Sequence, residues 1–396
     1  MDSTPSTPAH KLFAELWLFI AEDLLEEENG SRDVQSMTLV NRYLKDVMQP
    51  LLFHSVKLHV LLDFADDGTL VRHFHATRFI PLFMERLDFV TSARIAPRIQ
   101  YVEVGSYSWK WDSRIERHDG VDAQVLIHAL LDKLPSFVNL ARVLLQQIPL
   151  DTHCLERLSR VQTLTELSII ACWLRIKTFP TDDPAFRLRK LYLRVDSSDV
   201  EDYDNPWLAK LISCETEEID VTKDNVTRTL LSALSTMSTH LRSLRILLFH
   251  DVATRHPDFH RLLANCPALK ELRLTQSGSE PDVVQPIPAG YVPLLHTITG
   301  PWHIVKVYAQ HPSVRQLPHI VTDHHNFLPR VESIHAIRPE LTHLGISVFN
   351  SLHDINAIRF ALVHFRSLKS FTITAYTVLK MVLDDVCLHV TQFDTD

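Results

Sequence analysis

Glycine is scarce in this chain, whose 396 residues include only eight. The nearest pair, Gly290 and Gly300, stands ten positions apart. Phosphate-binding loops, dinucleotide-binding turns and the G-x-S-x-G nucleophile turn all need glycines within a few positions, because their backbone turns tightly or approaches a ligand closely. The spacing excludes these three kinds of site. Since no other catalytic signature is present, we expect a protein that is not an enzyme.

Cysteine and long apolar runs are also in short supply. The five cysteines include no C-x-x-C pair, and an odd number suits a reduced interior better than a disulfide framework. The N-terminal residues are polar and lack the basic-then-apolar order of a signal peptide. No apolar run reaches the ~18 residues that a membrane-spanning helix needs. We therefore expect a cytoplasmic and/or nuclear protein without a membrane partner.

Neither sign of charge is concentrated in one region. Lys and Arg number 40 and Asp and Glu 48, for a formal net charge of −8. Nucleic-acid affinity depends mainly on clustered Lys and Arg, so we expect no nucleic-acid partner. The acidic stretch from Asp196 to Asp204 lacks the central Gly and final Glu of a calcium-binding EF-hand loop. This stretch is typical of a solvated loop.

Histidine, in contrast, is plentiful at 23 residues, so metal sites need consideration. The two densest groups are His73 with His75, and His319 with His324 and His325. Neither group has the H-E-x-x-H or Cys/His spacing of a zinc site. We expect surface or capping histidines, with no metal and no cofactor.

One short pattern recurs through most of the chain: apolar, two residues, apolar, one residue, apolar. The clear copies are "LARVLL" from Leu140, "LTELSI" from Leu164, "LRKLYL" from Leu188, "TEEIDV" from Thr216, "LRSLRI" from Leu241, "LKELRL" from Leu269, "LTHLGI" from Leu341 and "LKSFTI" from Leu368. Weaker copies are "IQYVEV" from Ile99, "LHTITG" from Leu295 and "VRQLPH" from Val314. From Leu140 onward, successive copies start 19 to 28 residues apart.

This period lies in the range of leucine-rich repeats, roughly 20–29 residues. Each copy predicts a short strand, and the amphipathic stretches between copies, such as "DTHCLERLSRVQT" and "HPDFHRLLANCPA", predict helices. We therefore predict an α/β leucine-rich-repeat solenoid with a curved sheet and outer helices. The alternative is an ordinary α/β domain in which the spacing is coincidental. If the units stack, their strand residues form one buried ladder: Leu167, Leu191, Ile219, Leu244 and Leu272.

A more specific resemblance comes from "LLANCPALKELRL", Leu262 to Leu274. It is similar to the repeat unit of F-box proteins, in which the Cys packs where the helix returns to the strand. Cys266 is therefore expected in the core and not as a nucleophile. Three segments interrupt the array and predict loops: 105–123, 196–207 and 277–293.

Two apolar helical stripes precede the repeats. The first contains Leu12, Leu16, Ile20 and Leu24, and the second contains Val34, Met37, Val40, Leu44 and Val47. Pro50 should end the second helix, because it lacks an N–H and its ring clashes with the preceding turn. After it, Val56 and Leu58 flank Lys57 with the period of a strand.

The first stripe resembles the F-box motif Leu-Pro-x-Glu-Leu-x-x-x-Ile-x-x-x-Leu, with Phe13 in place of the Pro. "LVNRYLKDVMQPLLFHSVKL" resembles the end of that motif in fungal F-box proteins, with Leu44 where many have Trp. The resemblance implies binding to a Skp1-like adaptor and, through it, to a cullin. The implied adaptor contacts are Leu12, Leu16, Ile20, Leu24, Val40 and Leu44. Alternatively, these helices only cap the first repeat.

The resulting organisation is a flexible N-terminus (1–10), an F-box-like helical module (11–50) and a leucine-rich-repeat-like domain (51–396). The resemblance implies a non-catalytic substrate receptor of a Skp1–cullin–F-box ubiquitin ligase, whose repeats hold an unknown protein target. The alternative is a repeat scaffold that binds a partner without any ligase.

The target-binding surface is predicted from the alternation of side chains in strands. In each repeat, the residue between the last two apolar positions points away from the core, which places Ser168, Tyr192, Asp220, Arg245 and Arg273 in one row. Tyr and Arg dominate interface energetics, and a guanidinium can hold two oxygens at once. We expect Tyr192, Asp220, Arg245 and Arg273 to bind the target, with the arginines selecting an acidic or phosphorylated segment. The alternative is that these are ordinary solubilising residues.

Overall fold

The chain forms two compact units, Met1–Pro184 (unit 1) and Ala185–Asp396 (unit 2). The computed structural model describes residues 16–21, 23–24, 30–40, 42–60, 76–106, 123–174, 186–194, 206–222, 224–235, 240–249, 257–277, 284–322, 327–349, 355–376 and 386–391. The expected flexible segment 1–10 and the expected adaptor contact Leu12 lie outside these residues.

Unit 1 begins with a helical module. Residues 16–21 and 23–24 are helical, and α2 (Gly30–Thr38) and α3 (Arg42–Leu52) follow. The core of the module consists of Ala21, Val34, Leu44 and Met48, all buried. Three short helices provide this small core because each contributes one apolar stripe.

The prediction that Pro50 ends the second helix is wrong, since α3 continues through Pro50 to Leu52. Pro50 lies in the last turn of the helix and is exposed. The carbonyl that loses its N–H partner at this position can therefore bond to water instead. The predicted strand is present directly after the helix as β1 (Ser55–Val60), with Val56 and Leu58 buried.

The rest of unit 1 consists of strand–helix units. Its main strands are β1, β2 (Tyr101–Ser106), β3 (Arg142–Gln146) and β5 (Glu166–Ile170), parallel and in that order. The helices are α4 (Ala76–Val90), α5 (Ala123–Lys133) and α6 (Thr152–Ser159), with short 3-10 turns η1 (Ala96–Arg98) and η3 (Leu134–Ser136). A second ladder pairs β4 (Pro149–Leu150) with β6 (Trp173–Leu174).

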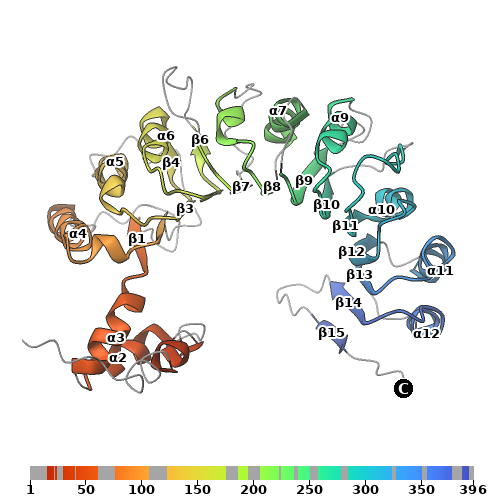
Figure 1. Ribbon diagram of the computed structural model, residues 1–396, viewed down its shortest axis with the longest axis horizontal. Helices are drawn as coiled ribbons and strands as arrows, with labels where there is room; N and C mark the ends of the chain where they lie inside the picture. Colours follow the sequence, from red (N-terminus) through yellow and green to blue (C-terminus); the bar gives the residue numbers. More distant parts are fainter. Residues whose placement is uncertain are drawn as a thin grey trace, which may run out of the picture. The chain divides into compact units, whose positions relative to one another are not determined.

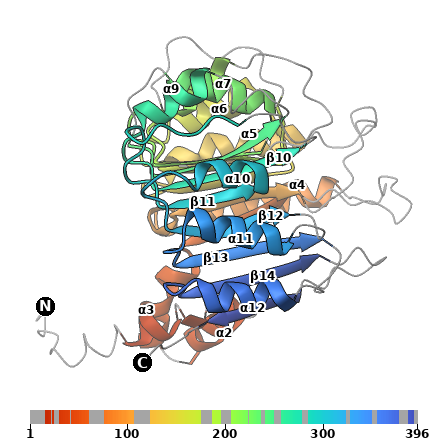
Figure 2. The same ribbon diagram turned by 90° about the vertical axis from the view of Figure 1, so that its right-hand side faces the viewer.

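Unit 2 continues the same pattern. Its parallel strands are β7 (Lys190–Arg194), β8 (Glu218–Val221), β9 (Ser243–Phe249), β10 (Glu271–Ser277), β11 (Thr297–Pro301), β12 (Gln316–Thr322), β13 (His343–Phe349) and β14 (Ser370–Tyr376), and β15 (Val386–Thr391) closes the edge antiparallel. The helices are η4 (Pro206–Leu211), α7 (Asp224–Ser235), α9 (Pro257–Asn265), α10 (Trp302–Tyr308), α11 (Phe327–Ile337) and α12 (Ile355–His364). In the described part of unit 2 the helices line one side of the sheet and leave the other side open (Figures 1 and 2).

The recurring sequence pattern and the strands coincide. Every predicted copy begins two residues before a parallel strand, at the eleven positions from Ile99 to Leu368. The first residue of each copy is buried, and in the copy that starts at Thr216 the hydroxyl donates to the carbonyl of Leu188. The predicted α/β leucine-rich-repeat-like solenoid is therefore confirmed. Cys266 is buried, as expected.

The apolar ladder is also present. In unit 2, Leu191 pairs with Ile219, Ile219 with Leu244, and Leu244 with Leu272, and all four are at most 1% exposed. In unit 1, Leu167 is fully buried and pairs with Val143 of β3. Each strand is too short to bury a face alone, so the ladder supplies a core that neighbouring repeats share.

Strand β12 carries one extra residue relative to both neighbours. Thr297 pairs with Gln316, but Thr299 pairs with His319, and on the other side Leu317 pairs with Leu344 while Ile320 pairs with Ile346. Such a β-bulge re-aims the side chains that follow it. Without it, regular register would place Pro318 opposite Thr299.

The predicted loops fall mainly outside the described residues, namely at 107–122, 195–205 and 278–283. The described residues 284–293 form neither helix nor strand. No helix among those described is both long enough and apolar enough to cross a membrane.

Candidate functional surfaces

The helical module exposes apolar side chains that its own core does not use. The largest are Leu16 at 55%, Phe19 at 68%, Leu39 at 83% and Val40 at 70% exposure. Of the expected adaptor contacts, Leu16 and Val40 belong to this group, which we call the apolar face, and Ile20 is half-buried. A soluble protein exposes single apolar side chains routinely, and contiguous apolar patches mark interaction sites. Here four large apolar side chains are each more than half exposed within residues 16–40.

Two other expected contacts support the module itself. Leu44 is 7% exposed and Leu24 packs partly buried against the same core. Leu44 can therefore contact an adaptor only if the module opens. An apolar stripe in a sequence does not distinguish a side chain that packs on its own chain from one that packs on a partner. For this reason the sequence predicted the buried Leu44 and the exposed Leu16 as the same kind of contact.

The open face of the unit 2 sheet carries the predicted target-binding row. Strand register joins Tyr192 to Asp220, Asp220 to Arg245, and Arg245 to Arg273. The same row continues through Thr299 to His319. We call these six residues the open-face row. Ser168 lies in unit 1, where it pairs with Leu144 of β3.

Asp220 does not occupy the exposed position expected of it. It is 5% exposed, with its Oδ2 2.7 Å from Nη2 of Arg194 and 3.5 Å from Nη1 of Arg245. A buried carboxylate is stable only when it is paired in this way. Asp220 therefore holds Arg245 in place, and the expectation that its side chain is accessible to a target is wrong.

Two arginines, each paired with a carboxylate, occupy the middle of the row. The side chain of Arg245 is one-third exposed and that of Arg273 about half exposed, with Arg273 Nε 2.7 Å from Oε1 of Glu271. Burial lowers the pKa of His319, and the charges of Arg245 and Arg273 lower it further. The two guanidinium groups thus disfavour a protonated imidazole at this position.

Sequence reasoning missed His319 and Thr299 as members of this row. His319 belongs to one of the dense histidine groups of the sequence, but simple alternation along β12 assigns Pro318, not His319, to the row. The bulge in β12 brings His319 there instead. No local sequence signal other than the Pro within a strand pattern marks that bulge.

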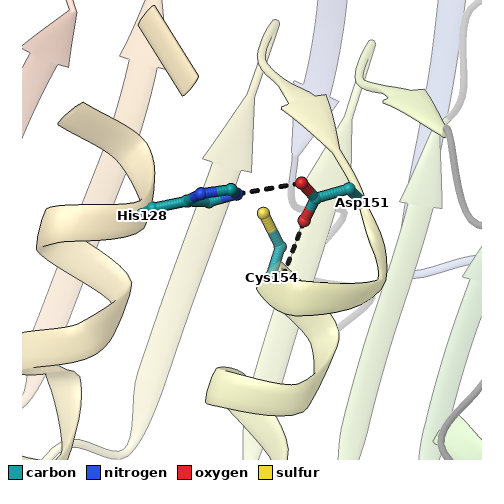
Figure 3. Close-up of side chains that lie close together, drawn as sticks. All are labelled: His128, Asp151 and Cys154. Atoms are coloured by element: carbon teal, nitrogen blue, oxygen red, sulfur yellow. Dashed lines mark hydrogen bonds and ion pairs between the residues drawn. The ribbon is translucent and has the colours of Figure 1, made fainter. Parts of the chain in front are cut away.

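Sequence reasoning also missed a cluster on the helix side of unit 1. His128 of α5 lies beside Asp151 and Cys154 at the start of α6, with His128 Nε2 2.9 Å from Asp151 Oδ2 (Figure 3). The three residues have no metal-site spacing in the sequence. They meet because His128 and Asp151 are 23 positions apart, close to one repeat period, so that neighbouring repeats stack them together.

No known protein family matches the sequence. No curated protein matches it either. Among solved structures, the chain is similar to one in the crystal structure of a Rad7 and Elc1 complex from yeast, at 13% identity and a TM-score of 0.45. That similarity covers 96% of this chain and 97% of the other. The strand order and the alternating helices of the described residues define the class of protein: an α/β repeat protein with a leucine-rich-repeat-like parallel sheet.

Proposed function

We propose that this chain is a non-catalytic substrate receptor of a ubiquitin ligase. Its helical module binds a Skp1-like adaptor and, through it, a cullin, while its repeat sheet binds a protein target. The chemistry of ubiquitin transfer belongs to other subunits.

The apolar face of the helical module carries this proposal. A module that only caps a solenoid needs a polar outer surface. Here Leu16, Phe19, Leu39 and Val40 are each more than half exposed. Such an arrangement supports a partner that covers the face, and the F-box resemblance of the same segment indicates a Skp1-like adaptor as that partner.

The test is the double variant Leu16→Asp with Val40→Asp. Both side chains are exposed, so the free chain should fold normally, but an adaptor would bury the new carboxylates without partners at a cost of several kcal/mol. We expect the adaptor to be lost from affinity purifications of the full chain. The matched control is Val363→Asp, which makes the same change at a 62% exposed valine of α12.

Undiminished co-purification of the adaptor with the double variant would contradict the proposal. If wild-type chain retains its targets but no adaptor co-purifies, the alternative of a repeat scaffold without a ligase is correct.

The open-face row is proposed to hold an acidic or phosphorylated segment of the target. Arg245→Glu with Arg273→Glu should release the target and keep the adaptor, because it reverses the charge at the centre of the row. A comparison of the proteins bound by wild type and variant measures this directly. Arg359→Glu with Arg366→Glu, both exposed at or just after α12, makes the same charge change elsewhere in unit 2.

Arg245→Gln with Arg273→Gln separates binding from folding, since it places no new carboxylate beside Asp220. Both double variants should lose the same targets. An unchanged set of bound proteins would remove the open-face row from the target-binding surface.

A further inference from the structure

Three side chains of the types that ligate metals lie together on the helix side of unit 1, at helices α5 and α6. The ligand atoms of His128, Asp151 and Cys154 all lie within 4.8 Å of one another. We propose that these three side chains bind one Zn²⁺ ion, which ties helix α5 of one repeat to the start of α6 in the next.

Local structure fixes two of the three ligands. Asp151 is the N-cap of α6, and its Oδ1 accepts a hydrogen bond from the backbone N–H of Cys154 at 2.9 Å. The cap holds the Cys154 side chain in the first turn, beside the carboxylate (Figure 3). His128 reaches the same point from α5, where its Nε2 lies 2.9 Å from the other carboxylate oxygen.

The donor set suits zinc. Thiolate, imidazole and carboxylate are the three side-chain ligand types of Zn²⁺, and a thiolate selects against Mg²⁺ and Ca²⁺, which prefer oxygen. In a tetrahedral site with zinc–ligand bonds of about 2.0–2.3 Å, ligand atoms stand about 3.3–3.6 Å apart. In this structure the Nε2–Oδ2 distance is 2.9 Å and no two of the three ligand atoms are more than 4.8 Å apart, so a common ion requires only small changes in their separations.

Burial leaves a route for the ion. Cys154 is fully buried, whereas the side chains of His128 and Asp151 are each one-third exposed. An ion can therefore enter past the imidazole and carboxylate and keep a water as its fourth ligand. The same burial argues against Cys154 as a nucleophile, because no substrate can reach its sulfur.

His153 is the other histidine close to the site. Its ring centroid lies 4.4 Å from that of His128. Its Nε2 is 3.4 Å from Oδ1 of Asp132, and the same oxygen is 2.7 Å from Nε of Arg157. Arg157 and His153 therefore both contact the carboxylate of Asp132. Because His153 has this partner, we assign it to the surroundings of the site and not to its ligands.

The test uses the full chain, freed of metal with a chelator and then titrated with Co²⁺, a spectroscopic substitute for Zn²⁺. We expect one ion per chain, tetrahedral ligand-field bands and a thiolate-to-cobalt charge-transfer band, all abolished when Zn²⁺ is added. Zn²⁺ should also raise the melting temperature, because it binds the folded state. His153→Gln should leave the charge-transfer band in place.

Matched variants separate a metal site from an ordinary helix cap. Cys154→Ser should remove the charge-transfer band, and Cys172→Ser, at another fully buried cysteine of unit 1, should keep it. Asp151→Asn retains a good N-cap residue but loses the charge. We expect it to weaken Co²⁺ binding at least ~10-fold, because changing only the hydrogen-bond partner of a metal ligand already weakens metal binding by about that factor.

Two results would overturn the proposal. One is the absence of any Co²⁺ spectrum when the metal exceeds the chain concentration. The other is a spectrum unaffected by Cys154→Ser and Asp151→Asn alike. If Cys154→Ser fails to fold, Asp151→Asn and His128→Gln decide the matter, since both alter partly exposed side chains. None of these outcomes depends on adaptor or target binding.

Discussion

Leu244→Ala is expected to lower the free energy of unfolding of unit 2 by ~2–5 kcal/mol, the range for removing a buried leucine side chain. Leu244 is fully buried in β9, and its neighbours in the ladder are Ile219 and Leu272. The truncation removes apolar contact with both neighbours and leaves a cavity in the middle of the array. Because each repeat is stabilised mainly by the ones beside it, weakening one central interface lowers the stability of both sides.

Chemical denaturation of the wild type and the variant measures the change. The matched control is Leu294→Ala, because Leu294 is 51% exposed and belongs to the same unit. A truncation at that surface position should change stability by no more than about 0.5 kcal/mol. Equal losses for the two variants would contradict the stacked-repeat core.

The strands of this fold could be predicted from sequence because two signals coincide there. The copies from Leu188 and Leu241, for example, alternate apolar residues with period two and recur with the repeat period. Burial of Leu191 and Leu244 follows from the first signal, and their adjacency follows from the second. A polar exception, Thr216, still fitted the pattern because its hydroxyl finds a backbone carbonyl in the core.

Other features depend on tertiary structure and could not be predicted. The antiparallel strand β15 has no copy of the pattern, and it pairs with β14 only because that edge is available. The burial of Asp220 depends on Arg194, a residue that simple alternation along one row does not include. The group around His128 forms only when two neighbouring helices are stacked.

The helical module shows most clearly what sequence does not predict. The sequence predicts its apolar stripes, but Leu44 is in the module's own core while Leu16 and Val40 are exposed. The hydrophobic effect is non-directional, so it does not specify whether an apolar side chain is covered by its own chain or by another. Only a structure separates the two groups, and the exposed group is the one that the adaptor experiment addresses.

Gly345→Ala is the second substitution with a large expected effect. A Cβ atom at this position would lie 1.8 Å from the carbonyl oxygen of Pro318 and 2.6 Å from its carbon. The close approach arises from the bulge, in which Pro318 and His319 of β12 oppose the single residue Gly345 of β13. Both clashing atoms belong to the backbone, so no side-chain rotation can relieve the contact.

We therefore expect Gly345→Ala to destabilise unit 2 by at least ~1–3 kcal/mol, the usual range for overpacking in an interior. Gly290→Ala is the control, because a Cβ there meets no heavy atom within 4 Å. Relief of the clash requires β12 and β13 to separate locally, and His319 would then leave its place opposite Thr299 in the open-face row. Its pKa, measured by NMR, should rise toward the ordinary value, because burial and the two arginines hold it low. A variant as stable as Gly290→Ala, with an unchanged His319 pKa, would show that the bulge does not position His319 in the open-face row.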